Sequence, residues 1–397
     1  MATKGRVHGE VRIHVAIEVA VLAMMGFLFS GCTTQGKKLT TSGYAWEPQI
    51  VWNGSHFGMV YFHRPDSKSS ASVHAMKIDV KGKVLQSKPK LAQLAYQLSY
   101  GDPYRISNLV WNPDNKQFAF AVAAKDGEET TVFLLDANCS VVGKPLVIGP
   151  TTKPLFPAKH VDLSLTWNPT VKEYAVACVH KQHPYTTGKD PVAISRFTPQ
   201  GKLAPWASSF GSARYPFSCS QDCSRTSIAS DLKTGHYAIA YFHGKDVMLG
   251  FVDKTYSKRS EHKIMSGWQS GSDGDAIRVV YDKKSGQYMV VAIKGTELAY
   301  QIIDANGKTA SKVFVKGKGY EPVFSLDKLG YGKHSQFVCA TKSSQVVGWP
   351  IYSTGHEKTD LVTLASSTKH PSVALVNVLT PYIAWIESGL LWFGAGN

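Results

Sequence analysis

Residues 107–149 decide the fold, and their sequence is SNLVWNPDNKQFAFAVAAKDGEETTVFLLDANCSVVGKPLVIG. Four short runs of strand-forming residues are separated there by turn residues such as Asn112-Pro113 and Asp136. Asn and Asp favour turns because their side chains bond the backbone two residues further on, while Pro presets φ. The stretch therefore predicts four short strands joined into an antiparallel meander.

The same pattern returns along the chain. An Asn or Asp opens the first turn of each unit: Asn53, Asn112, Asn168, Asp231, Asp282, Asp327 and Asn377. An aromatic residue then opens the next strand: Phe57, Phe118, Tyr174, Tyr237, Tyr288, Phe337 and Tyr382. These second strands place large residues on one face and Ala on the other, which suits stacking of one sheet on the next. We expect an all-β chain folded as a seven-bladed β-propeller of four-stranded antiparallel blades.

The two ends of the chain predict how the ring closes. The last unit, residues 370–397, has three expected strands and no fourth. Residues 36–39 (GKKL) match residues 143–146 (GKPL), the expected fourth strand of the second unit. We therefore expect residues 37–43 to complete the last blade within a propeller domain spanning 37–397, which removes an open sheet edge.

The N-terminus has the features of an export signal. Lys4, Arg6 and Arg12 precede an apolar run over residues 19–29 that is short for a membrane span. Residues 29–32 (FSGC) then resemble the bacterial lipobox, which implies a signal peptide over 1–31, a diacylglyceryl and palmitoyl modification on Cys32, and a lipidated tether over 32–36. Thr33 after this Cys implies the outer membrane by the Gram-negative sorting rule. An uncleaved anchor or an ordinary signal peptide remains an alternative.

Residues 135–138 (LDAN) and 303–307 (IDANG) are the clearest copies of a third-turn motif. Together with the recurring aromatic and Asn/Asp positions, they resemble the propeller repeats of bacterial surface lipoproteins, which are abundant in myxobacteria and related delta-proteobacteria. Residues 111–114 (WNPD) are also similar to a motif of the periplasmic Tol-system propeller. Residues 229–235 (ASDLKTG) resemble the turn motif of quinone-dependent and outer-membrane-assembly propellers. These resemblances imply a fold and an envelope location, and they carry no catalytic residue.

The charge balance bears on partners. The chain has a formal net charge of +15, and removal of residues 1–31 would leave +14. Such a charge favours an anionic partner, such as lipid headgroups, an acidic protein or an anionic glycan. Export argues against nucleic acid. The alternative is that the excess is scattered over the ring and serves solubility.

The six cysteines fit an exported protein without forming a dense framework. Cys219 and Cys223 are close enough in sequence for a short disulfide that staples a loop. Cys178 and Cys339 lie on second strands and are expected to be small buried hydrophobes. Cys139 falls in a turn and is expected to be an exposed thiol.

Long connections between blades, and between second and third strands, should emerge on one face. Binding residues concentrate on long loops carried by a rigid scaffold. The aromatic and Arg residues expected on this face are Tyr96, Tyr100, Tyr104, Arg105, Arg214, Tyr215, Phe217 and Trp268. The alternative is that these side chains only pack down their own loops.

Three histidines occupy equivalent positions at the same face, because His63, His180 and His243 each follow their second-strand aromatic by six residues. Ligands must converge on one ion to bind zinc. Equivalent positions on different blades lie too far apart for this, so no metal or cofactor is expected.

Enzyme signatures were not found: the chain has no nucleophile elbow, zincin helix or nucleotide-binding loop. We therefore expect a membrane-anchored envelope lipoprotein that acts as a non-catalytic binding or scaffold module, with an envelope protein as its partner. The alternatives are a glycan-binding or glycan-acting envelope protein and a propeller of the Tol or outer-membrane-assembly kind.

Overall fold

The computed structural model describes residues 36–66, 68–93, 106–123, 130–148, 159–181, 191–204, 214–217, 223–255, 257–267, 276–283, 285–294, 296–317, 320–328, 334–343, 345–352, 362–366, 369–377, 380–388 and 390–395. Within these ranges every regular element is a strand, and the strands form seven four-stranded antiparallel sheets. None of the described residues belongs to a helix with the length and apolar character needed to cross a membrane.

The first four sheets follow chain order. Their strands are β2 (Tyr44–Trp52), β3 (Phe57–Arg64), β4 (Ser72–Ile78) and β5 (Val84–Gln93); β6 (Val110–Asn112), β7 (Gln117–Ala123), β8 (Thr130–Asp136) and β9 (Leu146–Ile148); β10 (Lys159–Asn168), β11 (Glu173–Lys181), β12 (Val192–Phe197) and β13 (Arg214–Phe217); β14 (Cys223–Ser230), β15 (Tyr237–His243), β16 (Asp246–Val252) and β17 (Lys258–Met265).

The fifth and sixth sheets continue this order, and the seventh joins the two ends of the chain. Their strands are β18 (Ala276–Asp282), β19 (Gln287–Lys294), β20 (Glu297–Asp304) and β21 (Phe314–Gly317); β22 (Tyr320–Lys328), β23 (His334–Lys342), β24 (Gln345–Tyr352) and β25 (Val362–Ser366); β26 (Lys369–Asn377), β27 (Thr380–Glu387), β28 (Leu390–Ala395) and β1 (Lys37–Lys38). The chain is therefore all-β and built from a repeated four-stranded meander.

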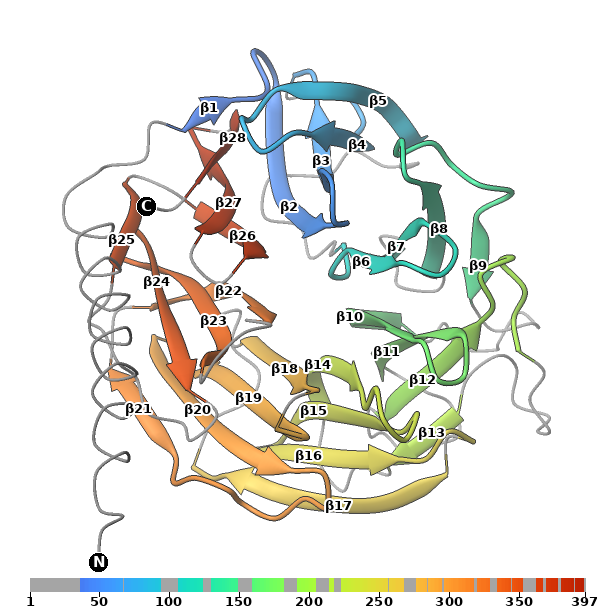
Figure 1. Ribbon diagram of the computed structural model, residues 1–397, viewed down its shortest axis with the longest axis vertical. Helices are drawn as coiled ribbons and strands as arrows, with labels where there is room; N and C mark the ends of the chain where they lie inside the picture. The colour runs from blue at the N-terminus through green and yellow to red at the C-terminus, as the bar shows by residue number, and fades with distance from the viewer. Residues whose placement is uncertain are drawn as a thin grey trace, which may run out of the picture.

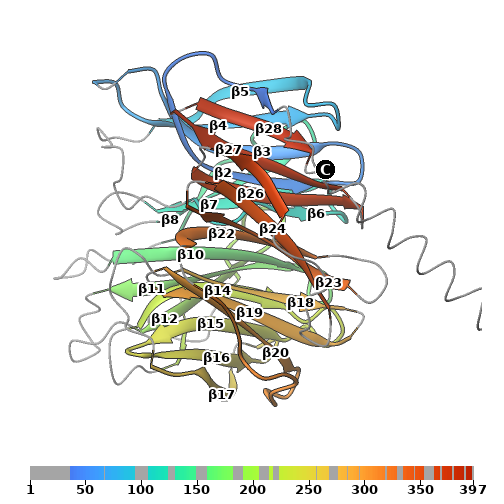
Figure 2. The same cartoon turned by 90° about the vertical axis from the view of Figure 1, so that its left-hand side faces the viewer.

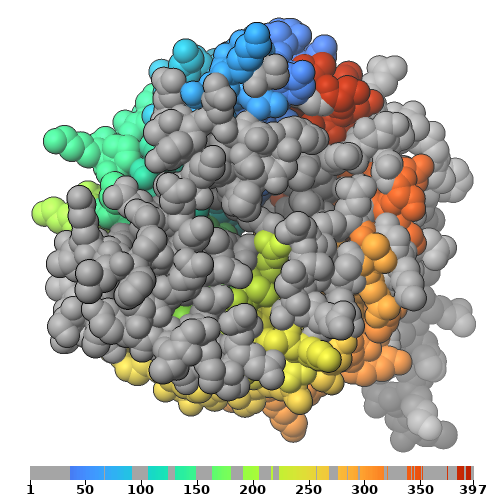
Figure 3. Space-filling model, turned by 180° about the vertical axis from the view of Figure 1, so that it is seen from behind, coloured from blue at the N-terminus to red at the C-terminus, as the bar shows by residue number. Residues whose placement is uncertain are grey.

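The sheets are arranged around a central axis (Figure 1), with β2, β6, β10, β14, β18, β22 and β26 nearest the axis. We call these the inner strands, and we call β1, β5, β9, β13, β17, β21 and β25 the outer strands. Figure 2 shows consecutive sheets lying over one another from the side. From behind, the described residues follow chain order around the ring, from blue near the N-terminus to red near the C-terminus (Figure 3).

The seventh sheet contains both ends of the described chain. Lys37 pairs with Phe393 and Lys38 with Trp392. Beyond the strand, the amide of Leu39 donates to the carbonyl oxygen of Leu391 at 2.8 Å, and the Leu391 amide donates to the Thr40 hydroxyl at 2.9 Å. The N-terminal strand is thus shorter than the expected 37–43, because the hydroxyl of Thr40 replaces a backbone partner and the chain turns at Gly43, with φ of 78°.

The first and last sheets pack against each other. The Phe57 ring lies 4.8 Å from that of Tyr382 and 5.2 Å from that of Phe393, measured between centroids. These three aromatics belong to one buried cluster that also includes Ala384 and Leu391. Residues more than 300 positions apart in sequence therefore share one core.

The large and small faces of the second strands stack as their alternation predicts. Tyr237 and Ile239 of β15 share a buried cluster with Ala175 and Ala177 of β11. A Cβ atom added to Gly58 of β3 would lie 2.6 Å from the Phe118 ring, so this position accepts only a glycine opposite that aromatic. Large side chains of one sheet fill the space left by small residues of the sheet before it.

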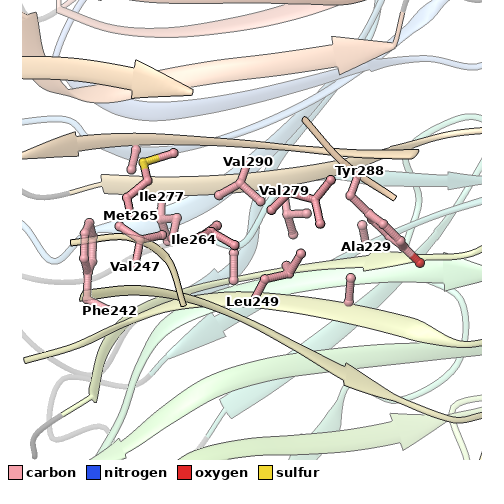
Figure 4. Packing of buried hydrophobic residues seen from close by; sticks show 14 of the residues in the cluster. Ala229, Phe242, Val247, Leu249, Ile264, Met265, Ile277, Val279, Tyr288 and Val290 are labelled. Carbon is pink, nitrogen blue, oxygen red and sulfur yellow. The ribbon is translucent and has the colours of Figure 1, made fainter. Parts of the chain in front are cut away.

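Figure 4 shows this packing between the sheet that ends at β17 and the sheet that begins at β18. Leu249 and Val247 of β16 share a buried cluster with Val279 of β18 and Val290 of β19. All four side chains are at most 4% exposed. Each sheet therefore completes its core only against its neighbours.

The predicted first turns are confirmed in most units. The side-chain oxygens of Asn53, Asn112, Asn168, Asp231 and Asp282 accept hydrogen bonds from backbone amides two or three residues further on. Asp327 differs, since it lies inside β22 and pairs with Phe337. The expected turn there starts later in the sequence than the pattern suggests.

Three of the described cysteines form no disulfide and are buried: Cys139, Cys178 and Cys339. The expectation holds for Cys178 and Cys339, but it is wrong for Cys139, which is only 1% exposed. Cys139 has a φ of 61°, which directs its thiol inward, where it donates to the Met76 carbonyl of the neighbouring sheet at 3.3 Å. Cys223 is disulfide-bonded. Cys219 lies outside the described residues, so its pairing with Cys223 stays a prediction.

Candidate binding face

The ring has two different faces. The connections from first to second strands and from third to fourth strands emerge on one face, which we call the turn face. It includes residues 53–56, 79–83, 136–140, 231–236 and 304–308. Second-to-third connections and the connections between sheets emerge on the opposite face, which we call the loop face. This division follows from the antiparallel order of every sheet.

The turn face is internally hydrogen-bonded. Asp79, Asp136, Asp253 and Asp304 each accept from the backbone amides two and four residues further on, at 2.8 to 3.0 Å. Each of these carboxylates is therefore hydrogen-bonded within its own turn. The turn face is therefore a set of short, self-contained turns, which leaves the loop face as the place for adaptable contacts.

Most of the residues predicted for the loop face lie outside the described residues. These are Tyr96, Tyr100, Tyr104, Arg105 and Trp268. Their assignment to the loop face follows only from the connections that contain them, between β5 and β6 and between β17 and β18.

Arg214, Tyr215 and Phe217 lie on β13, an outer strand, rather than in the long loop expected over residues 208–225. Leu203 makes only an isolated bridge with Phe197, so β13 is the fourth strand of this sheet. Phe217 is fully buried, so its prediction as a surface anchor is wrong. Its ring stacks on Tyr241 at 5.6 Å and fills the space above Gly250, where a Cβ would lie 2.2 Å away.

The three predicted histidines lie at equivalent register positions. His63 pairs with Ala45, His180 with His160 and His243 with Cys223, so each is at the loop-face end of its second strand. Among the described residues, no group of three or more His, Cys, Asp or Glu is arranged to hold a metal ion. His180 and His243 lie on different sheets from His63.

The ring of His63 instead contacts the ring of a histidine that the sequence analysis missed. The His63 ring lies 4.8 Å from that of His74 on β4, and the His74 Nε2 atom is 2.9 Å from the Ser72 hydroxyl. Burial, and to a smaller extent the charge of His63, lowers the pKa of His74 to about 4. The sequence held a signal for this contact. Side chains alternate between the two faces of a strand, so His74 lies on the same face of β4 as Ser72, which pairs with His63 on β3.

A second feature was also missed. Five inner strands carry an irregularity near their loop-face ends, between Trp46 and Gln49, Val161 and Ser164, Ser224 and Thr226, Tyr320 and Phe324, and Lys369 and Ser372. Each contains an ionisable residue: Glu47, Asp162, Arg225, Glu321 and His370, respectively. Bulges re-aim side chains and often lie next to functional sites.

The sequence signal for three of these five bulges is a proline inside a strand. Glu47-Pro48, Glu321-Pro322 and His370-Pro371 place a residue without an amide hydrogen where a ladder bond is lost, and such residues are confined to edges and bulges. Glu47 has a φ of 49°, and its Oε2 accepts from the Ile106 amide of the next sheet at 3.2 Å. Charged residues thus recur close to the axis on the loop face.

Comparisons with known proteins show the fold alone. No family model and no curated protein matches the chain. The chain is similar in structure to a Dos1 propeller, with a TM-score of 0.53 at 8% identity over 92% of this chain and 95% of that one. The fold is a β-propeller. Hydrazine synthase from Kuenenia stuttgartiensis is similar as well, with a TM-score of 0.51 at 13% identity, covering 90% and 97%.

The NanB sialidase of Streptococcus pneumoniae is also similar in structure, with a TM-score of 0.47 at 12% identity, covering 92% of this chain and 70% of that one. Fold alone does not decide a function, which must come from the site.

Proposed function

We propose that this chain is a membrane-anchored, non-catalytic binding module whose loop face captures a partner in the cell envelope. The observation that carries the proposal is the difference between the two faces. The turn face consists of short turns whose carboxylates are bonded within the turn, whereas the loop face carries the long connections and the bulged inner strands with Glu47 and Arg225. Adaptable contacts on a rigid scaffold suit recognition.

The scaffold that we propose is a closed ring of seven blades. Its support is the pairing of Lys37 and Lys38 with β28 and the shared core of Phe57, Tyr382 and Phe393. A full chain lacking residues 37–42 should lose several kcal/mol of unfolding free energy, because β28 becomes an open edge. Urea unfolding with an unchanged midpoint would contradict the closed ring.

The anchor that we propose is acylated Cys32, in an envelope lipoprotein whose outer-membrane location is implied by Thr33. Two or more acyl chains hold a protein on a bilayer far more firmly than one, since each buried methylene contributes ~0.8 kcal/mol. Radiolabelled palmitate should enter the wild-type chain and not the Cys32→Ser chain. Equal labelling of both would refute acylation at Cys32.

Partner capture tests the loop face. In a pull-down from native envelope, Tyr104→Ala and Trp268→Ala should weaken capture by ~2 kcal/mol or more if these residues are hot spots. Tyr256→Ala is the matched control, because residue 256 belongs to the connection between β16 and β17, which joins the third and fourth strands of one sheet. Equal losses from both faces would overturn the assignment.

One observation favours a second candidate, a glycan-acting protein. Glu47, Asp162 and Glu321 each occupy a bulge of an inner strand on the loop face. Paired carboxylates are the machinery of most glycosidases. Saccharide hydrolysis that is abolished by Glu321→Gln and retained by the turn-face variant Asp304→Asn would favour this candidate over the binding module.

A further inference from the structure

Among the described strands, the excess of basic over acidic residues lies on the outer strands. Within their bounds the outer strands contain one acidic residue, Glu261, and the basic residues Lys37, Lys38, Lys88, Lys90, Arg214, Lys258, Arg259, Lys263 and Lys316. The inner strands are balanced, with Lys159, Arg225, Arg278, Lys328 and Lys369 against Glu47, Asp162, Asp282, Glu321 and Asp327. The excess is therefore on the circumference and not spread evenly.

One part of this circumference forms a patch between the first and last sheets. The turn of residues 79–83 lies against β1, because a Cβ added to Gly82 would be 3.4 Å from Lys37 Cδ and 3.3 Å from the Phe393 ring. Lys37, Lys38, Lys81 and Lys83 are all exposed there, and we call them the junction lysines. Four cationic side chains are thus gathered at the meeting point of the chain's two ends.

Exposed apolar side chains accompany the junction lysines. Val80 at the tip of the turn is 41% exposed, and Leu85 on β5 is 47% exposed. The acidic residue of this turn is Asp79, and its Oδ1 accepts hydrogen bonds from the backbone amides of Lys81 and Lys83, both at 2.8 Å. Lysines around protruding aliphatic residues match the chemistry of an anionic lipid surface, which offers charged headgroups above acyl chains.

The direction of the chain favours a membrane as the occupant. β28 runs toward the turn face and β1 is antiparallel to it, so Gly36 enters the ring at the turn face, beside the junction lysines. The apolar run 19–29 and Cys32 precede this point, and the five residues from Cys32 to Lys37 reach at most ~18 Å. Any bilayer that holds the N-terminal segment is therefore close to the patch.

We propose that the junction lysines, with Val80 and Leu85, dock the propeller on an anionic bilayer surface, so that the turn face lies toward the membrane and the loop face points away. The acyl chains on Cys32 hold the chain on the bilayer, and the basic patch decides which face of the ring lies against the membrane. The proposal rests on the proposed membrane anchor for its setting. The orientation of the propeller on the membrane is then decided by the junction lysines, which the fold brings together.

The test uses the full chain carrying Cys32→Ser, so that acylation does not contribute. Binding is measured by flotation with vesicles of phosphatidylcholine alone and with vesicles containing phosphatidylglycerol, and the ratio of the two apparent affinities is the readout. The N-terminal apolar run contributes to both vesicle types, so the ratio isolates the charge-dependent part. The wild-type ratio should be large at low salt and should shrink above ~0.15 M salt, where the Debye length is about 8 Å.

The decisive variant changes the four junction lysines to Gln. Each lysine near an anionic surface contributes roughly fivefold in affinity, so removing all four should lower the ratio by about 600-fold. The matched control changes Lys68, Lys90, Lys245 and Lys263 to Gln, which removes the same charge from exposed positions at or towards the loop face and should change the ratio less than about threefold. A second variant, Val80→Ser with Leu85→Ser, should weaken binding to the anionic vesicles by about tenfold.

Two results would overturn the proposal. A wild-type ratio near one means that the patch does not recognise anionic lipid, and equal losses in the junction and control variants mean that only net charge matters. Neither result affects palmitate labelling of Cys32 or partner capture by the loop face, so failure of the docking surface is distinguishable from failure of the proposed function. Thermal unfolding of each variant establishes that the ring is intact.

Discussion

The side-chain amide of Asn108 bonds both backbone groups of Leu165 on the next sheet. Its nitrogen donates to the Leu165 carbonyl at 2.6 Å, and its oxygen accepts from the Leu165 amide at 2.9 Å. An inner strand has an unpaired edge at the axis, and this amide acts there as a short piece of a neighbouring strand. Ser164 and Ser227 make single bonds of the same kind, accepting from the amides of Ile228 and Val279.

Asn108→Ala should therefore destabilise the protein more than an ordinary surface change. It leaves two backbone groups of the buried Leu165 without partners, and we expect a loss of about 2–4 kcal/mol in unfolding free energy. Urea unfolding followed by circular dichroism measures it. Asn138→Ala is the control, because Asn138 is exposed on a turn, and it should stay within about 0.5 kcal/mol. Similar values for both variants would contradict this role for Asn108.

Thr40→Val tests the junction of the two ends. It keeps the shape of the side chain and removes the hydroxyl that accepts from the amide of buried Leu391 at 2.9 Å. We expect a loss of about 1–2 kcal/mol. Thr41→Val at the neighbouring exposed position should have little effect. If the two changes lower the denaturation midpoint equally, the hydrogen bond does not hold the N-terminal strand.

The thiol of Cys139 should be unreactive in the folded protein. Burial, together with nearby Asp136, raises the pKa of Cys139 to about 12, so roughly one molecule in 10⁴ carries the thiolate at pH 8. Iodoacetamide labelling at pH 8, mapped by mass spectrometry, should leave Cys139 unmodified until denaturant is added. A cysteine introduced at exposed Val142 should label readily and serves as the control. Rapid native labelling of Cys139 would show that this turn opens.

His74 should make stability depend on pH. Burial lowers the pKa of His74 to about 4, while an unfolded chain keeps a value near 6.5. Between these values the unfolded state binds more protons, so the free energy of unfolding should fall as pH drops from 6.5 to 4. Because the ring is partly exposed, we expect His74 to account for about 1–2 kcal/mol of that fall.

His74→Gln should remove this component. Urea unfolding at pH 7, 5.5 and 4.5 should give a shallower dependence for the variant than for the wild-type chain. The same slope in both would mean that His74 is not the group that titrates. Because His56 also has a lowered pKa, through burial, a residual slope in the variant is expected.

Much of the fold could be predicted because its signals are local. Turn residues such as Asn112 and Asp231 bond the backbone within three residues, and the alternation of Phe118 and Ala119 is set by the period of a strand. The likeness of residues 36–39 to 143–146 predicts a strand at the N-terminal end, and Lys37 and Lys38 pair with β28. The candidate site was harder to predict from the sequence. Phe217 shows why, because an aromatic residue can be buried in a core or exposed on a binding loop, and the sequence does not distinguish the two.

By itself the sequence determined the strand repeat, its turns and the two faces of each sheet, because neighbours within about ten residues specify them. Only the tertiary structure decided what lies between sheets. It buries Cys139 beneath Met76, joins Asn108 to Leu165 and places Lys37 beside Gly82. The last two pairs lie 57 and 45 positions apart in the chain. No local pattern encodes such contacts, since they depend on how whole sheets stack.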